Sequence, residues 1–128
     1  MIRQIEDLEA ELNRLDRKFE RFGDTVLVSM GPGRPPIAMR VATPVLVMHV
    51  VIGSLVRRGA PEQVKLFRRL LELNASTLLH SSFGLEGDSI VLAAALELET
   101  VDPNEIEAAL ADMDMALAEH VPALRELV

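Results

Sequence analysis

The sequence predicts an α+β domain in which helices pack an antiparallel five-stranded sheet, in the order α-β-β-β-α-β-β-α. Three observations support this fold class. Apolar residues near the N-terminus recur at alternating spacings of four and three, as on one face of a helix. Segments with a period of two follow and are joined by short turns, as in antiparallel strands. Two later amphipathic segments each open with a proline, Pro61 and Pro103. The 128 residues suffice for one domain over 1–128.

The first helix is predicted over residues 1–22 and ends at Gly23. Its apolar residues occupy the a and d positions of a heptad pattern: Met1, Ile5, Leu8, Leu12, Leu15, Phe19 and Phe22. Such a helix can form a coiled coil with another chain. Because the repeat is short, we favour a helix that lies on the sheet of its own domain.

Three strands are predicted next, over residues 25–30, 37–42 and 45–52. The prolines and glycines of residues 31–36 predict a loop between the first two. The third strand is apolar on both faces, which indicates a central strand or a face that meets a partner. The face assigned here to partner binding carries Leu46, Met48, Val50 and Ile52.

A second helix is predicted from Pro61 to Asn74, with an apolar stripe and a basic face. The stripe consists of Val64, Phe67, Leu70 and Leu71. Basic residues of the helix and of the preceding loop form the one basic patch of the chain: Arg57, Arg58, Lys65, Arg68 and Arg69. The patch is either a solvated surface or an anchor for an acidic segment of a partner or of a second copy.

Two more strands are predicted over residues 78–84 and 89–98, joined by a turn at 85–88. One face of the second strand carries large apolar residues at strict alternation. The other face carries the smaller residues Val91, Ala93 and Ala95, which would let a helix or another chain approach closely.

The last helix begins at Asp102, because an Asp N-cap, a Pro and a Glu at the third helical position form a capping-box pattern. Its predicted buried stripe is Ile106, Ala109, Leu110, Met113, Leu117 and Val121. Its acidic residues, Asp112 among them, are expected around the exposed side. Pro122 ends or kinks the helix near His120.

Composition excludes several classes of function. The chain has no Cys, Trp or Tyr, which excludes disulfides, thiolate metal sites and a cysteine nucleophile. The net charge is −7, which disfavours nucleic acid as a partner. Residues 86–128 hold 11 acidic residues and a single basic one, Arg125. The sequence contains no apolar stretch typical of export or of a membrane span, so we expect a cytoplasmic protein that does not engage the membrane.

No catalytic, cofactor-binding or metal-binding residues are predicted. The spacing of His49, His80 and His120 matches no local metal motif. A Ser/His site would require His49, His80 and either Ser81 or Ser82 to meet in one concave site, which the sequence does not indicate.

Several segments of the second half resemble the YbjN-like family of the type III secretion chaperone-like superfamily. They are Leu70–Ala75, Leu78–His80, Phe83–Asp88, Val91–Leu92 and the entry into the last helix from Leu96–Glu99 to Asp102–Glu105. The resemblance covers Pro61–Val128, whereas Met1–Gly59 match by element order alone. It implies a homodimer that holds a partner polypeptide by groove filling and strand addition, with no catalytic signature to transfer.

The sequence therefore predicts a non-enzymatic, dimeric, chaperone-like or adaptor protein that binds a protein or peptide client and needs no cofactor. The expected contact residues are Leu46, Met48, Val50, Ile52, Arg57, Arg58, Arg68, Arg69, Val91, Ala93 and Ala95. The alternative is a structural oligomerisation module that uses the N-terminal heptad helix. A small enzyme or ligand-binding domain is the least favoured interpretation.

Overall fold

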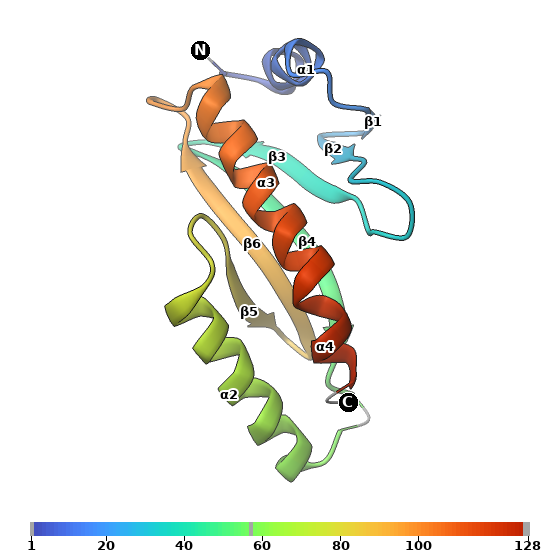
Figure 1. Cartoon of the computed structure of the whole chain (residues 1–128). Helices are drawn as coiled ribbons and strands as arrows, with labels where there is room; N and C mark the ends of the chain where they lie inside the picture. Colours follow the sequence, from blue (N-terminus) through green and yellow to red (C-terminus); the bar gives the residue numbers. More distant parts are fainter. Residues whose placement is uncertain (1, 57, 127–128) are drawn as a thin grey trace.

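One antiparallel six-stranded sheet, in the order β1-β2-β3-β4-β6-β5, positions every other element (Figure 1). The computed structural model describes residues 2–56 and 58–126. In chain order the elements are α1 (Ile5–Arg14), β1 (Phe19–Phe22), β2 (Thr25–Val28), β3 (Ile37–Ala42), β4 (Val45–Ser54), α2 (Ala60–Ser76), β5 (Ser82–Glu86), β6 (Ser89–Glu97), α3 (Pro103–Glu119) and α4 (Val121–Glu126).

The α+β class is confirmed, but the sheet has six strands, because the end of the predicted first helix is strand β1. Asp16 adopts a left-handed conformation with φ 59°, which ends the helical geometry before β1 begins. Gly23, with φ 62°, then supports a two-residue turn that pairs Phe22 with Thr25. The heptad pattern therefore spans a helix and a strand, and in the strand Phe19 packs half-buried against the core while Phe22 is 57% exposed.

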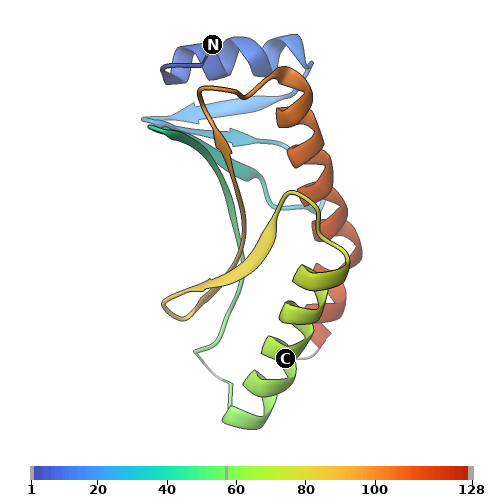
Figure 2. The ribbon, with the colours of Figure 1, turned by 90° about the vertical axis from the view of Figure 1, so that its left-hand side faces the viewer.

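The helices cover one face of the sheet, and the other face is free of helices (Figure 2). Strands β3 and β4 alternate accordingly, with Ile37, Met39, Leu46 and Met48 fully buried on the covered face. On α1, Leu8 and Leu12 are 0% exposed and belong to this core. Since they are buried within their own chain, they are not available for a coiled coil. The prediction that the first helix lies on its own sheet is confirmed for α1.

Helix α2 faces the sheet with half of the predicted stripe, since Leu70 is buried and Phe67 packs half-buried against the core. Leu66, Leu70 and Leu73 are buried, whereas Val64 and Leu71 are 66% and 68% exposed. The sequence pattern is ambiguous here because apolar residues occur on two sides of the helix. The predicted strand over 78–84 also starts later, at Ser82, because the preceding residues form a loop that binds α3.

The last helix agrees with its predicted pattern. All six residues of the predicted stripe, Ile106, Ala109, Leu110, Met113, Leu117 and Val121, are buried. The Asp102 side chain accepts a hydrogen bond of 2.8 Å from the Glu105 N–H, as expected of an N-cap. Helix α3 ends at Glu119 with His120 as its C-cap, and α4 follows with Pro122 in its first turn. This break confirms the one predicted near His120.

We predict that Leu12→Ala lowers the free energy of unfolding by about 3 kcal/mol, because it leaves a cavity under α1 in the core. Chemical denaturation of the purified protein measures this change. The native mass should stay the same, because Leu12 contacts its own sheet. A variant of unchanged stability that loses its oligomeric state would contradict this packing and favour a coiled coil.

Candidate functional site

Four of the predicted contact residues lie in the core. Leu46 and Met48 are 0% exposed, and Val50 and Ile52 are also buried, on the face of β4 that the helices cover. We correct the prediction for these four residues, since the domain's own helices occupy the face that they form. The strand does have a second apolar face, and it consists of the alternate residues Val45, Val47 and Val51.

That second face is part of the open, concave side of the sheet (Figure 2). Ala93 and Ala95 pair with His49 and Val47 and lie on this side, half-buried and exposed respectively. Val91 shares the face but is buried. The His49 Nε2 atom lies 3.2 Å from a carboxylate oxygen of Glu86. Ala93 and Ala95 are thus at least partly accessible on this side, whereas Val91, also predicted as a contact residue, is buried.

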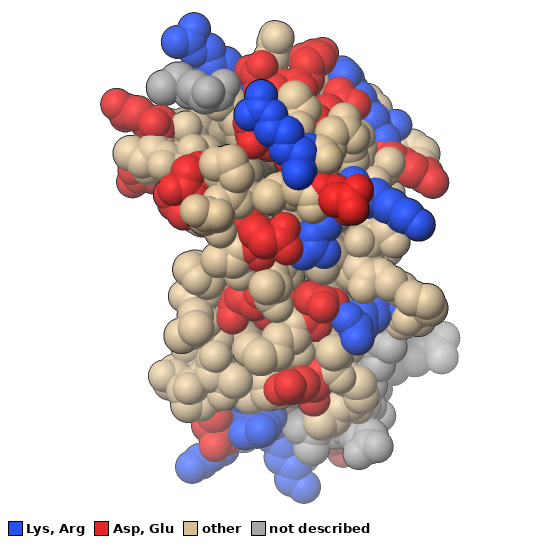
Figure 3. All heavy atoms as spheres, turned by 45° about the horizontal axis from the view of Figure 1, so that its top comes forward, with Lys and Arg blue, Asp and Glu red and all other residues tan. Residues whose placement is uncertain are grey.

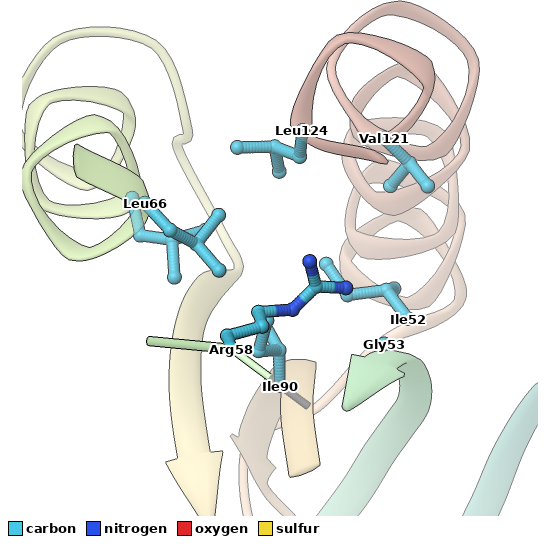
Figure 4. A pocket seen from close by; sticks show the side chains of 8 residues that line it. Ile52, Gly53, Arg58, Leu66, Ile90, Val121 and Leu124 are labelled. Carbon is cyan, nitrogen blue, oxygen red and sulfur yellow. The ribbon is translucent and has the colours of Figure 1, made fainter. Parts of the chain in front are cut away.

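The basic residues do not form one continuous patch. The Arg58 side chain enters a small apolar pocket between α2 and α4, where its Nε–H donates to the Ser54 carbonyl at 2.8 Å (Figure 4). Arg68 and Arg69 are exposed on α2. Arg57 lies outside the described residues. Arg68 and Arg69 therefore present charge to solvent, while Arg58 is hydrogen-bonded to Ser54, the last residue of β4.

The structure does not bring the histidines and serines into one site. The Ser81 hydroxyl donates to Asp112 in a buried position, and His80 is exposed in the same loop. Ser82 lies in the same row of the sheet as His49, but strand β6 separates them by about 10 Å, which is two strand spacings. Among the described residues, no group of three potential metal ligands occurs.

Strand β1 forms one edge of the sheet, and its outward backbone groups lack hydrogen-bond partners among the described residues. The Ser29 N–H donates to the Lys18 carbonyl at 2.9 Å, so Lys18 points its backbone carbonyl toward β2. In an antiparallel ladder every second residue points its N–H and C=O toward the neighbouring strand. Phe19 and Arg21 consequently point theirs away from β2, at the open edge.

A hollow lies beside this edge. Its lining combines apolar, polar and charged residues: Lys18, Phe19, Glu20, Leu27, Ser29, Arg34 and Pro36. The Arg34 side chain is held by an ion pair with Asp114 on α3. Arg21 is held in the same way by Glu6 and Glu9 of α1, at 3.3 and 2.9 Å. The edge is therefore firmly placed although its backbone is open.

Strand β5 forms the opposite edge, and two side chains bind part of its outward backbone groups. The Phe83 N–H donates to Asn74 Oδ1 at 2.7 Å, and Asn74 Nδ2 donates to the Phe83 carbonyl at 3.0 Å. The next outward group toward the N-terminus is the Ser81 N–H, which donates to Asp112 Oδ2 at 2.9 Å. The β5 edge thus has side-chain partners for part of its outward backbone groups, which the β1 edge lacks among the described residues.

Asp112 is the buried carboxylate of the domain, where the sequence predicted an exposed one. It accepts hydrogen bonds from the backbone N–H groups of Leu79 and His80 at 3.2 and 3.1 Å, and from the Ser81 hydroxyl at 2.7 Å. Burial raises the pKa of this carboxyl, but the Ser81 hydroxyl and the backbone N–H groups outweigh burial and hold the pKa below its ordinary value. The charge of Asp112 therefore fixes the loop before β5 to α3.

Sequence reasoning missed the residues that define both edges. A signal for β1 was present, because Gly23-Asp24 between two β-prone segments is a hairpin pattern. For Asn74 and Asp112 the sequence offers no such signal, since their partners are backbone groups that only the tertiary fold brings near.

Comparisons with known proteins agree with this architecture. The family model described as CesT_Tir_1 matches residues 1–128. YbjN from E. coli, a candidate transcription regulator, superposes with a TM-score of 0.71 at 13% identity, over 96% of this chain and 95% of that chain. No curated protein matches the sequence. None of the described helices is long and apolar enough to cross a membrane.

Two solved complexes contain a similar chain. One is the heterodimeric ExoU–SpcU complex of the type III secretion system of Pseudomonas aeruginosa, with a TM-score of 0.72, 16% identity and coverage of 93% of this chain and 98% of that chain. The other is the HopA1–SchA chaperone–effector complex, with a TM-score of 0.61, 13% identity and coverage of 93% and 90%. The predicted secretion chaperone-like fold is confirmed.

We predict that Asp112→Asn lowers the free energy of unfolding by about 2 kcal/mol at pH 7, because the backbone donors lose a charged acceptor. The folded-state pKa of Asp112 is lowered, so its stabilising contribution is present above about pH 5 and declines as the pH falls through about 4. Denaturation at several pH values measures this, and the difference between the two proteins should shrink in acid.

Asp114→Asn is the matched control, since Asp114 forms a part-exposed ion pair on the same helix and should contribute under about 1 kcal/mol. Equal losses for the two variants at all pH values would contradict the role assigned to Asp112.

Proposed function

The chain belongs to the CesT_Tir_1 family, and from that premise we propose that it is a non-enzymatic chaperone-like protein that holds an extended segment of a partner polypeptide in the cytoplasm. The observation that carries this proposal is the open edge of β1. Backbone N–H and C=O groups at a sheet edge pair with any extended chain, so the site selects for conformation first and for side chains second.

The β1 edge offers a defined docking frame. Phe19 and Arg21 present two N–H and two C=O groups in register, which suits a partner strand of about five residues. Alternate side chains of that strand would face the hollow beside β1, whose lining includes the apolar residues Leu27 and Pro36. Lys18 and Glu20 also line it, so the hollow carries both signs of charge. The client segment is therefore expected to be extended and to place an apolar residue in the hollow.

The relatives support a polypeptide as the ligand. ExoU–SpcU and HopA1–SchA are complexes between two proteins, and the second is a chaperone with its effector. Charge argues against nucleic acid for this chain. The net charge is −7, and acidic and basic side chains are interspersed at the end of the molecule seen in Figure 3.

We further propose that α2 forms the homodimer surface. Val64 and Leu71 are seven residues apart, so they project from the same side of the helix, and both are exposed. Arg68 lies between them and makes a 3.8 Å contact with Glu72. Two such helices could bury their apolar residues against each other with the charges at the rim. Val64 and Leu71 belong to the apolar stripe predicted for this helix, and their exposure supports a second copy as the neighbour.

We predict that Arg21→Pro reduces capture of the partner by at least about tenfold. Proline removes the outward N–H of residue 21, and its ring blocks an added strand, while the β1–β2 ladder does not use this N–H. Affinity capture on the tagged protein, quantified by mass spectrometry, measures the loss.

Arg21→Ala is the control, because it removes the ion pairs with α1 and keeps the N–H. Equal capture by Arg21→Pro and the wild type would contradict the proposed site. Equal loss with Arg21→Ala would assign binding to the guanidinium instead of the backbone.

We predict that the wild type sediments at about twice 14.1 kDa and that Leu71→Glu raises the dimer dissociation constant at least about 100-fold. A carboxylate buried at the interface without a partner costs several kcal/mol, which sets this scale. Sedimentation velocity over a concentration series measures it. Val51→Glu, an exposed apolar position on the open sheet face, should leave the dimer intact. Dissociation by Val51→Glu alone would place the interface on the sheet.

A further inference from the structure

We propose that Asn74 is the residue that determines which edge of the sheet accepts a polypeptide strand, by closing the β5 edge. The inference rests on the proposed function for its biological meaning, because a closed β5 edge directs the partner to β1. The contacts that support it are different ones, namely those between α2 and β5. Asn74 does not touch the proposed partner and acts through the backbone of Phe83, as a positioning residue.

The side-chain amide of Asn74 takes the place of a neighbouring strand. It accepts from the Phe83 N–H at 2.7 Å and donates to the Phe83 carbonyl at 3.0 Å, so one residue satisfies both outward groups. A residue on an added antiparallel strand would make the same pair of bonds with its own N–H and C=O. Since both groups are already bonded, a polypeptide would have to displace the amide before it could pair here.

The closure extends along the strand. Outward groups occur at every second residue of β5, namely at residues 81, 83 and 85. Asp112 accepts from the Ser81 N–H, and Asn74 binds both outward groups of Phe83, so Leu85 is the one described residue of β5 whose outward N–H and C=O both lack a partner. Strand β1 keeps two consecutive outward residues free. The difference between the edges is therefore produced by two side chains, and Asn74 holds the central position.

Packing explains why Asn74 can act in this way. Helix α2 lies against β5, with Leu70, Leu73 and Phe83 all buried. Asn74 follows Leu73 directly and is half-buried at this contact, so its amide is fixed beside the strand. An open sheet edge tends to pair with the same edge of a second copy. Loss of the Asn74 hydrogen bonds should therefore show as self-association through β5.

Asn74→Ala tests the proposal without any client. We expect the Phe83 amide to exchange with solvent about tenfold faster in hydrogen exchange measured by NMR, since its acceptor is lost. We also expect assemblies larger than the wild-type species in sedimentation velocity at equal concentration. Adding Leu85→Pro should reverse the assembly, because it removes the remaining outward N–H of β5 and leaves the β5–β6 ladder bonded.

The second-site variants separate edge opening from simple destabilisation. Adding Arg21→Pro instead of Leu85→Pro should leave the larger assemblies in place, because Arg21 is on the other edge. If Asn74→Ala does not fold, Asn74→Asp replaces it in the same measurements, since it keeps the acceptor for the Phe83 N–H and loses the donor to the Phe83 carbonyl. The proposal is overturned if the folded Asn74 variant forms only the wild-type species. It is also overturned if the variant forms larger assemblies that Leu85→Pro does not reverse. Neither result depends on whether Arg21→Pro affects partner capture.

Discussion

The outward backbone N–H and C=O groups on the two edges of an open antiparallel sheet need hydrogen-bond partners. The other features of this domain depend on how each edge meets that requirement. Strand β5 is closed at Ser81 and Phe83, where Asp112 and Asn74 supply hydrogen bonds that a further strand would supply, while Leu85 keeps its outward groups free among the described residues. Strand β1 is tied to α1 by the ion pairs of Arg21, but its outward groups have no partner among the described residues. Under the proposed function, this difference between the edges directs an extended chain to β1 and disfavours pairing at β5.

The distribution of charge serves the same arrangement. Most acidic residues are in the second half of the chain, and part of this charge is used within the molecule. Arg17 pairs with Glu107, and Arg34 pairs with Asp114, so residues near β1 and its hollow are tied to α3. The buried charge of Asp112 fixes the loop at the other edge. Acidic residues of α3 thus reach both edges of the sheet, in addition to any contribution to solubility.

The sequence predicted those features that depend on local pattern. The α+β class, the start of α3 at Asp102 and the stripe through Met113 follow from capping and periodicity, and the structure confirms them. The end of α1 could not be read from its heptad spacing, because a helix and a following strand can place apolar residues at the same intervals. Which face of β4 is buried was undetermined, since both faces are apolar. Asn74 and Asp112 act on distant backbone groups, which no local pattern reveals.

The central claim is that the β1 edge holds an extended segment of the partner. Amide hydrogen exchange of the protein, alone and in complex with a co-purified partner, tests it most directly. The N–H groups of Phe19 and Arg21 should exchange rapidly in the free protein and become protected at least about tenfold in the complex, with Phe83 unchanged. Protection that appears on the open sheet face or on α2, with Phe19 and Arg21 still in rapid exchange, would contradict it.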